Sequence, residues 1–101
     1  MKKTVRYGKM MIMVKERKKS YFVYLLRCAD GTLYCGYTTD LERRVAAHNA
    51  GKGAKYTKAR LPVELAWFEE KESLSAALSE ECRIKRLSRA EKLRLLAKNE
   101  K

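Results

Sequence analysis

The pattern of apolar and polar residues changes at position 21, and from there it predicts regular secondary structure. Residues 21–28 (YFVYLLRC) are almost continuously apolar and rich in aromatic and branched side chains, which is typical of a short strand buried on both faces. The sequence ADGT at 29–32 is a turn signal, and residues 33–37 follow as a second strand. The first predicted unit is therefore a β-hairpin.

The type of turn in this hairpin decides which side chains share a face. A two-residue Asp-Gly loop would place Tyr24 and Tyr34 on opposite faces of the sheet. A type I turn over residues 28–31 would have Gly31 at its last position, which that turn favours, and would give the other register. In that second register Tyr24, Tyr34 and Gly36 lie on one face.

The residues after the hairpin predict a short helix over residues 40–51. A Thr-Thr-Asp sequence supplies the N-terminal cap, and a glycine ends the pattern. At about 100° per residue, Leu41 and Val45 form the buried stripe, and Arg44 and His48 lie along its edge. We therefore expect Arg44 to face the margin of the sheet.

The second half of the chain predicts a basic loop, one more strand and two helices. The loop covers residues 51–60 (GKGAKYTKAR), and a third strand covers residues 63–68. A helix runs from residue 73 to about residue 87, and a capping box at 88–91 begins the last helix. The predicted order is strand, strand, helix, strand, helix, helix.

A carboxylate interrupts the apolar side of the helix that begins at residue 73. The arc is formed by Leu74, Ala77, Leu78 and Ile84. Glu81 falls inside this arc, whereas Glu80 is expected on the solvent side. A carboxylate that faces a core must be paired or must bind a cation. Lys85 lies one turn later, so an intrahelical ion pair is the alternative to a cation site.

Length and charge narrow the class of protein. The chain has 101 residues, enough for one core, so we expect a single domain over residues 21–101. It has 24 Lys and Arg residues against 12 Asp and Glu, a formal net charge of +12. This excess favours a polyanionic partner held through phosphate contacts, and nucleic acid is the leading candidate. The alternative is a charged surface that only maintains solubility.

The remaining features predict a soluble, cytoplasmic protein. Residues 1–20 are basic and show no clear period, so we expect a weakly ordered N-terminal arm. No segment approaches the ~20 apolar residues of a membrane span. The three cysteines, Cys28, Cys35 and Cys82, have no spacing typical of a zinc site, and they are interpreted as small buried hydrophobic residues in a reducing compartment.

Five side chains together suit the hydrolysis of a phosphodiester: Tyr24, Tyr34, Arg44, His48 and Glu81. Glu81 would bind one hydrated Mg²⁺, and the forked donors of Arg44 would contact phosphoryl oxygens. Tyr34 would accept a proton from water if neighbouring cations lowered its pKa. His48 is the rival base or a donor to phosphate. Taken singly, each residue has an ordinary structural role, namely strand packing, a polar helix edge or a solvated charge.

The basic loop and the helix near Glu81 supply candidate contacts to nucleic acid. These residues are Lys52, Lys55, Tyr56, Lys58, Arg60 and Lys85. A loop with cations and one aromatic ring is suited to follow a phosphate backbone.

At these positions the chain resembles the GIY-YIG nuclease family. FVY at 22–24 stands where the family has its first Gly-Ile-Tyr, and YCG at 34–36 stands where it has Tyr-Ile-Gly. DLERR at 40–44 resembles the helix that follows, with its arginine, and Glu81 stands at the place of the metal-binding glutamate. The resemblance covers residues 21–97. It is strongest to the small single-domain UPF0213 group and extends to the nuclease module of Slx-type junction endonucleases.

The resemblance implies an α/β fold in which helices flank a three-stranded antiparallel sheet. It also implies an endonuclease that uses a single Mg²⁺ or Mn²⁺ ion. By the same resemblance, Tyr24 or Tyr34 would help deprotonate the attacking water, Arg44 would stabilise the transition state, and Glu81 would bind the metal. His48 stands where the family often has Tyr or His. The first glycine of the family is replaced here by Phe22.

Two classes of function follow from these residues. The first is a metal-dependent endonuclease that hydrolyses DNA, selective for structure, in repair or recombination. The alternative is a nucleic-acid-binding module with weak or no catalysis, which uses the same basic surface. A protein partner that directs the substrate choice is a further hypothesis, with the apolar residues 10–14 as its contact.

Overall fold

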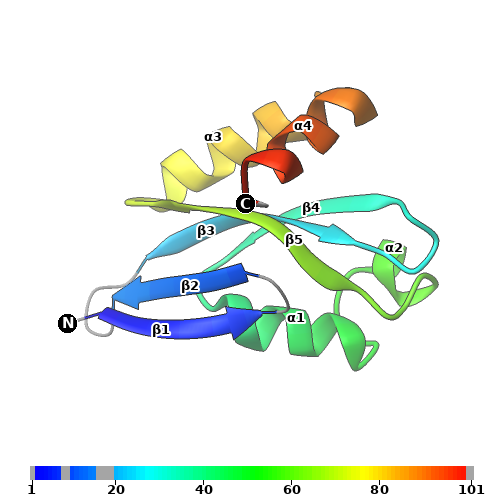
Figure 1. Cartoon of the computed structure of the whole chain (residues 1–101), viewed down its shortest axis with the longest axis horizontal. Coiled ribbons are helices and arrows are strands. Elements are labelled where there is room, and N and C mark those ends of the chain that lie inside the picture. The colour runs from blue at the N-terminus through cyan, green and yellow to red at the C-terminus, as the bar shows by residue number, and fades with distance from the viewer. Residues whose placement is uncertain (1, 8–9, 16–19, 100–101) are drawn as a thin grey trace.

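The computed structural model describes residues 2–7, 10–15 and 20–99, and it has two separate antiparallel sheets (Figure 1). The smaller sheet pairs β1 (Lys2–Tyr7) with β2 (Met10–Lys15). The larger sheet has the order β4-β3-β5. Its strands and the helices that follow them are β3 (Tyr21–Arg27), β4 (Leu33–Thr38), α1 (Leu41–Asn49), α2 (Lys55–Lys58), β5 (Glu64–Lys71), α3 (Leu74–Lys85) and α4 (Arg89–Asn99). The predicted fold, a three-stranded antiparallel sheet flanked by helices, is confirmed.

The turn between β3 and β4 gives the register that places both tyrosines on one face. The backbone N–H of Gly31 donates to the Cys28 carbonyl (2.9 Å), and the Cys28 N–H donates to the Thr32 carbonyl (2.8 Å). Gly31 has φ of +85°, which a residue with a Cβ rarely adopts. The type I turn alternative is therefore correct, and Tyr24 lies opposite Gly36.

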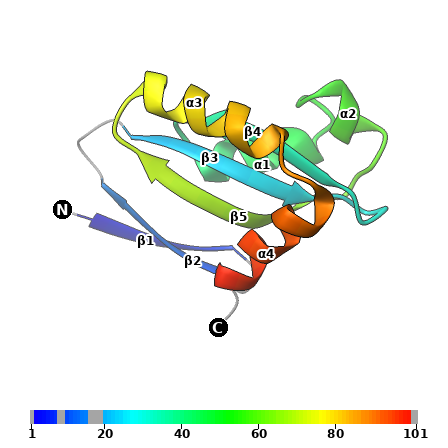
Figure 2. The ribbon, with the colours of Figure 1, turned by 90° about the horizontal axis from the view of Figure 1, so that it is seen from above.

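Alternate residues of β3 supply two different cores. Phe22, Tyr24 and Leu26 point to the face covered by α1 and pack with Leu41 and Val45 of that helix. A second cluster packs on the face covered by α3 and α4 and consists of Val23, Leu25, Cys35, Ala66, Trp67, Ala77, Ile84 and Leu96. Figures 1 and 2 show α1 on one side of the sheet and α3 and α4 on the other.

Helix α1 is anchored at both ends, so its side chains are held in place over the sheet. The Asp40 carboxylate caps the helix by accepting from the Arg43 N–H (3.1 Å), as the sequence predicts. At the other end, the Asn49 amide donates to the Val63 carbonyl (2.9 Å) and accepts from the Val63 N–H (2.7 Å). The helix is thereby joined to the segment that enters β5.

The apolar arcs of α3 and α4 are narrower than the sequence predicts. Leu74 and Leu78, expected in the core, are each 42 % exposed, and Leu93 of α4 is 40 % exposed. Ala77 and Ile84 are fully buried and form the centre of the α3 contact. Because an alanine lets a helix approach a sheet closely, the larger side chains at the edges of the stripe remain outside the contact.

Glu80 also departs from its expected place on the solvent side of α3. Only 15 % of its side chain is exposed, and it pairs with Arg83 at 2.6 Å. Hydrogen bonds from Arg83 lower the pKa of the Glu80 carboxyl. The predicted capping box of α4 is present: the Ser88 hydroxyl accepts from the Glu91 N–H, and the Glu91 carboxylate accepts from the Ser88 N–H.

Residues 1–20, expected as a weakly ordered arm, contain the β1–β2 pair, which the sequence pattern did not predict. Residues 10–14, the suggested partner contact, fall in β2, and their side chains lie outside the described residues. The division of the chain into an arm and a domain at residue 20 stays a prediction.

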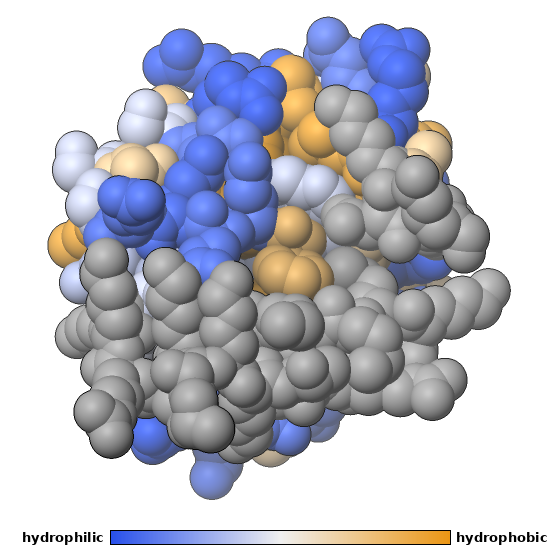
Figure 3. Space-filling view, turned by 60° about the vertical axis from the view of Figure 1, so that its left-hand side comes forward, coloured by the Kyte–Doolittle hydropathy of each residue, from blue (hydrophilic) through white to orange (hydrophobic). Residues whose placement is uncertain are grey.

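The exposed surface is largely hydrophilic, as expected from the high content of charged residues. In Figure 3 hydrophilic side chains cover much of the described face, and apolar areas show between them. Within the described part of the chain, no helix is long and apolar enough to cross a membrane. All three cysteines are free thiols; Cys28 and Cys35 are buried as predicted, but Cys82 is exposed because it lies on the outer side of α3.

Candidate active site

The hydroxyl of Tyr24 lies against the backbone of Gly36 on the neighbouring strand. A Cβ at position 36 would stand 2.6 Å from the Tyr24 oxygen, so only glycine admits this close approach. Tyr24 as a whole is 2 % exposed. The Tyr-Cys-Gly sequence therefore contributes a phenol at position 34 and, at position 36, the space for a second phenol.

His48 lies directly behind Tyr24 and is hydrogen bonded to it. The Tyr24 hydroxyl and the His48 Nε2 atom are 3.1 Å apart, and the His48 Nδ1 atom is 2.8 Å from the Thr57 hydroxyl. His48 is 1 % exposed, so it lies in the core and not along a polar helix edge, as its helical position had suggested. With its ring buried, His48 reaches the surface only through its neighbours, which disfavours the predicted role as a direct donor to phosphate.

The surroundings of this pair keep both groups uncharged near neutral pH. Burial lowers the pKa of His48, and the charge of Arg44 lowers it further. Burial raises the pKa of Tyr24; Arg44 acts against this change, whereas Tyr34, Cys35 and Glu81 add to it. A neutral imidazole next to a neutral phenol is an arrangement that can accept and pass a proton.

Tyr34 forms the exposed side of the same cluster. Its ring meets the His48 ring edge to face, with centroids 5.4 Å apart, and stacks on Tyr56 with centroids 6.0 Å apart. The Arg60 guanidinium lies 3.9 Å from the Tyr56 ring centroid and pairs with Asp30 (3.1 Å). The basic loop is thereby fixed on the β3–β4 turn, and it brings its aromatic residue to the candidate site.

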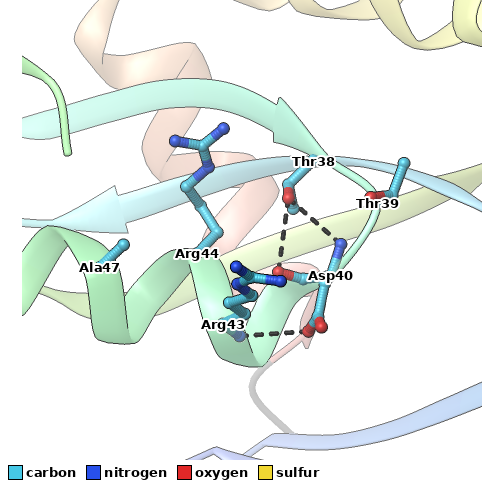
Figure 4. A pocket seen from close by; sticks show the side chains of 6 residues that line it. All are labelled: Thr38, Thr39, Asp40, Arg43, Arg44 and Ala47. Carbon is cyan, nitrogen blue, oxygen red and sulfur yellow. Dashed lines mark hydrogen bonds between the residues drawn. The ribbon is translucent and has the colours of Figure 1, made fainter. Parts of the chain in front are cut away.

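Arg44 extends from α1 beside an open pocket at the start of the helix. This pocket is lined by Thr38, Thr39, Asp40, Arg43, Arg44 and Ala47 (Figure 4). Arg44 is exposed, and among the described residues no carboxylate forms an ion pair with it. Its charge acts on both Tyr24 and His48, so it is close to them and free to bind an anion.

Glu81 approaches the site from the opposite side of the sheet. Its side chain is 17 % exposed, as expected for a position inside the apolar arc, and it pairs with Lys85 at 3.3 Å. Its charge acts on Tyr24 and also on Cys35, whose pKa is raised to about 12, mainly by burial. Helix α3 contacts β4, the strand that carries Tyr34, so Glu81 is held near this edge of the sheet.

The donor set around Glu81 fits a hydrated hard cation. No group of three or more His, Cys, Asp or Glu residues lies close enough to hold a metal within the described ranges, so a fully protein-coordinated ion such as structural zinc does not fit. Mg²⁺ keeps several waters and needs only one or two carboxylates. Glu81 can provide one, and the exposed Lys85 ammonium can move aside.

The candidate contacts to nucleic acid have different surroundings. Lys52, Lys55 and Lys58 are exposed on the loop and on α2, and Tyr56 is 40 % exposed. The short helix α2 was not expected, because the sequence there looked like an open loop. Arg60 and Lys85 are already paired with carboxylates, so they are less free to bind phosphates than the three lysines.

Two residues at the site were not found by sequence reasoning. Thr57 is fully buried against His48, and Gly53 lies over the same ring, where a Cβ would be 2.6 Å from the His48 Cγ atom. Neither residue type suggests chemistry by itself. The second glycine in the basic loop was the one available signal, since it marks a close approach of the backbone to another group.

Comparison with known proteins agrees with this geometry. A family model described as the GIY-YIG catalytic domain matches residues 20–94. A UPF0213 protein of Natronomonas pharaonis is 61 % identical over 77 residues, which are 76 % of this chain and 91 % of that protein. A UPF0213 protein of Streptococcus pyogenes is 55 % identical over 85 residues, 83 % of this chain and 91 % of that protein.

Two solution NMR structures are also similar. The UPF0213 protein of Bacillus halodurans has a TM-score of 0.51 and 44 % identity, covering 77 % of this chain and 83 % of that chain. A protein of E. faecalis has a TM-score of 0.57 and 43 % identity, covering 83 % of this chain and 90 % of that chain.

Proposed function

Since the chain belongs to the GIY-YIG catalytic domain family and is similar to its UPF0213 members, we propose that it is a metal-dependent endonuclease. The family is one of nucleases, so the proposal concerns the metal, the substrate and the roles of individual residues. The observation that carries it is the hydrogen bond between the Tyr24 hydroxyl and the neutral His48 ring, with the unpaired Arg44 beside them.

The proposed proton acceptor is the Tyr24–His48 pair. The Tyr24 hydroxyl donates to His48 Nε2 and passes its proton there as its oxygen takes a proton from the attacking water. The phenol is neutral before and after this exchange, which suits its raised pKa. The raised pKa disfavours a mechanism that begins from a free tyrosinate. Tyr34, which packs against His48, would orient the water at the open side.

Arg44 and Glu81 would act on the phosphate itself. Arg44 would donate from its guanidinium to the non-bridging oxygens, where negative charge increases in the transition state. Glu81 would hold Mg²⁺ or Mn²⁺, and such an ion supplies positive charge at the scissile phosphate and the leaving oxygen. The single, largely buried carboxylate supports one ion and not two.

The proposed substrate is DNA, cut in a structure-selective way during repair or recombination. The exposed Lys52, Lys55 and Lys58 would bind backbone phosphates next to Tyr56. The formal charge of +12 supports a polyanion as the partner. A protein partner that selects the DNA structure, and a cytoplasmic location, belong to the same proposal.

The test is cleavage of labelled junction, flap and duplex DNA in Mg²⁺, in Mn²⁺ and in chelator. Glu81→Ala and Arg44→Ala are compared with two matched controls. Glu72→Ala removes an exposed carboxylate just before α3, and Arg94→Ala removes an exposed cation of α4. We expect metal-dependent cutting that falls by about 10²–10³-fold in Arg44→Ala and at least as far in Glu81→Ala, with both controls near wild type.

The alternative, a binding module without catalysis, predicts a different set of results. It would give salt-sensitive DNA binding and no metal-dependent cutting of any of the three substrates. Cutting that persists in chelator, or that is unchanged in Glu81→Ala, would contradict the metal assignment while leaving nuclease activity intact.

A further inference from the structure

The back of the His48 ring is held by a buried threonine hydroxyl. Thr57 is fully buried, and its hydroxyl oxygen lies 2.8 Å from His48 Nδ1. The same hydroxyl donates to the backbone carbonyl of Ala54 at 2.9 Å, across the first turn of α2. The threonine thus stands between the imidazole and a carbonyl that can only accept.

The donors and acceptors along this series of hydrogen bonds indicate which ring nitrogen of His48 carries the proton. A hydroxyl has one hydrogen, and that of Thr57 goes to the Ala54 carbonyl. With its hydrogen in this bond, the hydroxyl has only its oxygen to offer to His48, 2.8 Å away, an arrangement that fits a ring proton on Nδ1. In a neutral imidazole the other nitrogen, Nε2, is then an acceptor, and the Tyr24 hydroxyl is the donor that reaches it.

We infer that Thr57 is a positioning residue that fixes His48 as the Nδ1–H tautomer and so leaves Nε2 free to accept a proton through Tyr24. The order of donation runs from the Tyr24 hydroxyl to His48, from His48 to Thr57, and from Thr57 to the Ala54 carbonyl. If Nε2 carried the proton instead, the imidazole could not act as a base for Tyr24. The tautomer stands independently of the proposed function, whereas its effect on cleavage rests on that function.

Gly53 completes the enclosure that makes this control effective. A side chain at position 53 would collide with the His48 ring at its Nδ1 side, so the glycine backbone closes over the nitrogen that Thr57 holds. With His48 only 1 % exposed, bulk water does not compete with the threonine for Nδ1. The basic loop therefore encloses His48 and holds its Nδ1 atom, in addition to presenting its lysines to solvent.

The groups that face His48 from β3, β4, α1 and α2 all favour a neutral imidazole. Tyr24 of β3 and Tyr34 of β4 face the imidazole, and Arg44 of α1 is the charge that acts on it. Thr57 of α2 is neutral, and among the described residues Arg44 is the charged group that acts on the ring. The ring is consequently positioned by two hydrogen bonds and by the packing of its neighbours, without an ion pair.

The direct test is the tautomer of His48 in the intact wild-type protein. The chain has a single histidine, so long-range ¹H–¹⁵N NMR correlations of the imidazole belong to His48 without further assignment. We expect a pyrrole-like Nδ1 and a pyridine-like Nε2 at neutral pH. A pyridine-like Nδ1 in the wild type would overturn the inference, whatever the activity of the protein.

Two variants extend the test to catalysis. Thr57→Val keeps the shape but removes the hydroxyl, and it should move the ring proton to Nε2 in a large fraction of molecules. It should also lower kcat by roughly 10–100-fold, the usual cost of losing a supporting partner, with KM nearly unchanged. Thr57→Ser retains the hydroxyl and should restore both the tautomer and kcat.

The outcomes separate the two claims. An unchanged tautomer in folded Thr57→Val contradicts the inference, and so does a Thr57→Ser protein that behaves like Thr57→Val. If the tautomer changes while kcat does not, Thr57 does not position the base for cleavage. A wild type that has the expected tautomer but cuts no substrate contradicts the proposed function alone. If Thr57→Val does not fold, the wild-type spectrum still decides the tautomer.

Discussion

The two faces of the three-stranded sheet are built from alternate residues of the same strands, yet they differ in chemistry. On the α3 and α4 face, the buried cluster contains only apolar side chains and one thiol. On the α1 face, the cluster includes Tyr24, and beside it both ring nitrogens of His48 and the hydroxyl of Thr57 are buried and hydrogen bonded. Burial therefore stabilises the fold on both faces, and on the α1 face it also holds a polar network in place.

The contrast explains how a chain of 101 residues can place a candidate active site within its core. A buried polar group costs free energy unless it is fully paired, so a site made of buried phenol and imidazole needs neighbours that satisfy each atom. The apolar face supplies the burial that offsets this cost. We expect changes in the polar network of the α1 face to affect mainly catalysis and changes in the apolar cluster of the opposite face to affect mainly stability, with Glu81 of α3 as the exception.

The largest expected effect on the α1 face is that of Tyr24→Phe. Loss of the hydroxyl removes the proton path to His48, and the rate of DNA cleavage should fall by roughly 10²–10⁴-fold, as for loss of a general base. Tyr37→Phe removes the hydroxyl of an exposed tyrosine on β4 and is the matched control, which should cut at a nearly normal rate. Single-turnover cleavage with saturating protein measures both, and equal rates for the two variants would remove Tyr24 from the mechanism.

On the opposite face, Leu96→Ala should lower the free energy of unfolding by about 2–5 kcal/mol, because Leu96 is 2 % exposed and its removal leaves a cavity. Urea denaturation followed by circular dichroism measures this change. The folded fraction should cut DNA at the wild-type rate. A loss of activity larger than the loss of folded protein would show that the two faces are not separable.

Gly36→Ala tests the packing of the α1 face itself, since the backbone of Gly36 and the phenol of Tyr24 are in contact there. The added methyl would meet the Tyr24 oxygen, and we expect a loss of about 1–3 kcal/mol in the free energy of unfolding, as for overpacking. The displaced phenol should also slow cleavage. An active Gly36→Ala protein of normal stability would mean that Tyr24 can move without consequence.

The buried imidazole should make stability depend on pH. His48 has a lowered pKa in the folded state, so the unfolded chain binds its proton more readily. Its contribution to stability is complete above the ordinary histidine pKa of about 6.5 and is lost as the pH falls through the lower folded value. Denaturation at a series of pH values measures this slope, and His48→Gln should lack it. A wild type whose stability does not change across this window would indicate that the ring is not buried in a neutral form.

The smallest effect is expected at the rim, where Lys55 and Lys58 are exposed. Each alanine substitution should weaken DNA binding slightly and reduce the slope of log K against log salt by about one unit. Fluorescence anisotropy at several salt concentrations measures this slope. A change in kcat with no change in binding would place these lysines within the catalytic site instead of at its rim.

Much of the fold follows from local sequence. The apolar run of β3, the Asp40 and Ser73 caps and the capping box of α4 each act through neighbours within a few residues, so their positions could be predicted. The turn was harder, because Ala29-Asp30-Gly31 permits two registers. The hydrogen bonds at Cys28 select the one that places Tyr24 opposite Gly36.

The functional groups at the candidate site could also be predicted from the sequence. They are two phenols, a guanidinium, an imidazole and a carboxylate at spacings typical of the family. The sequence alone could not place His48, since a helix edge and a core position look alike until the basic loop is folded over them. Thr57 and Gly53 acquire their roles only there, because hydrogen bonding between atoms nine residues apart and the closing of a backbone over a ring depend on tertiary packing. The sequence therefore determined which groups are present, and the tertiary structure decided which of them are exposed, which are paired and which nitrogen is left to accept a proton.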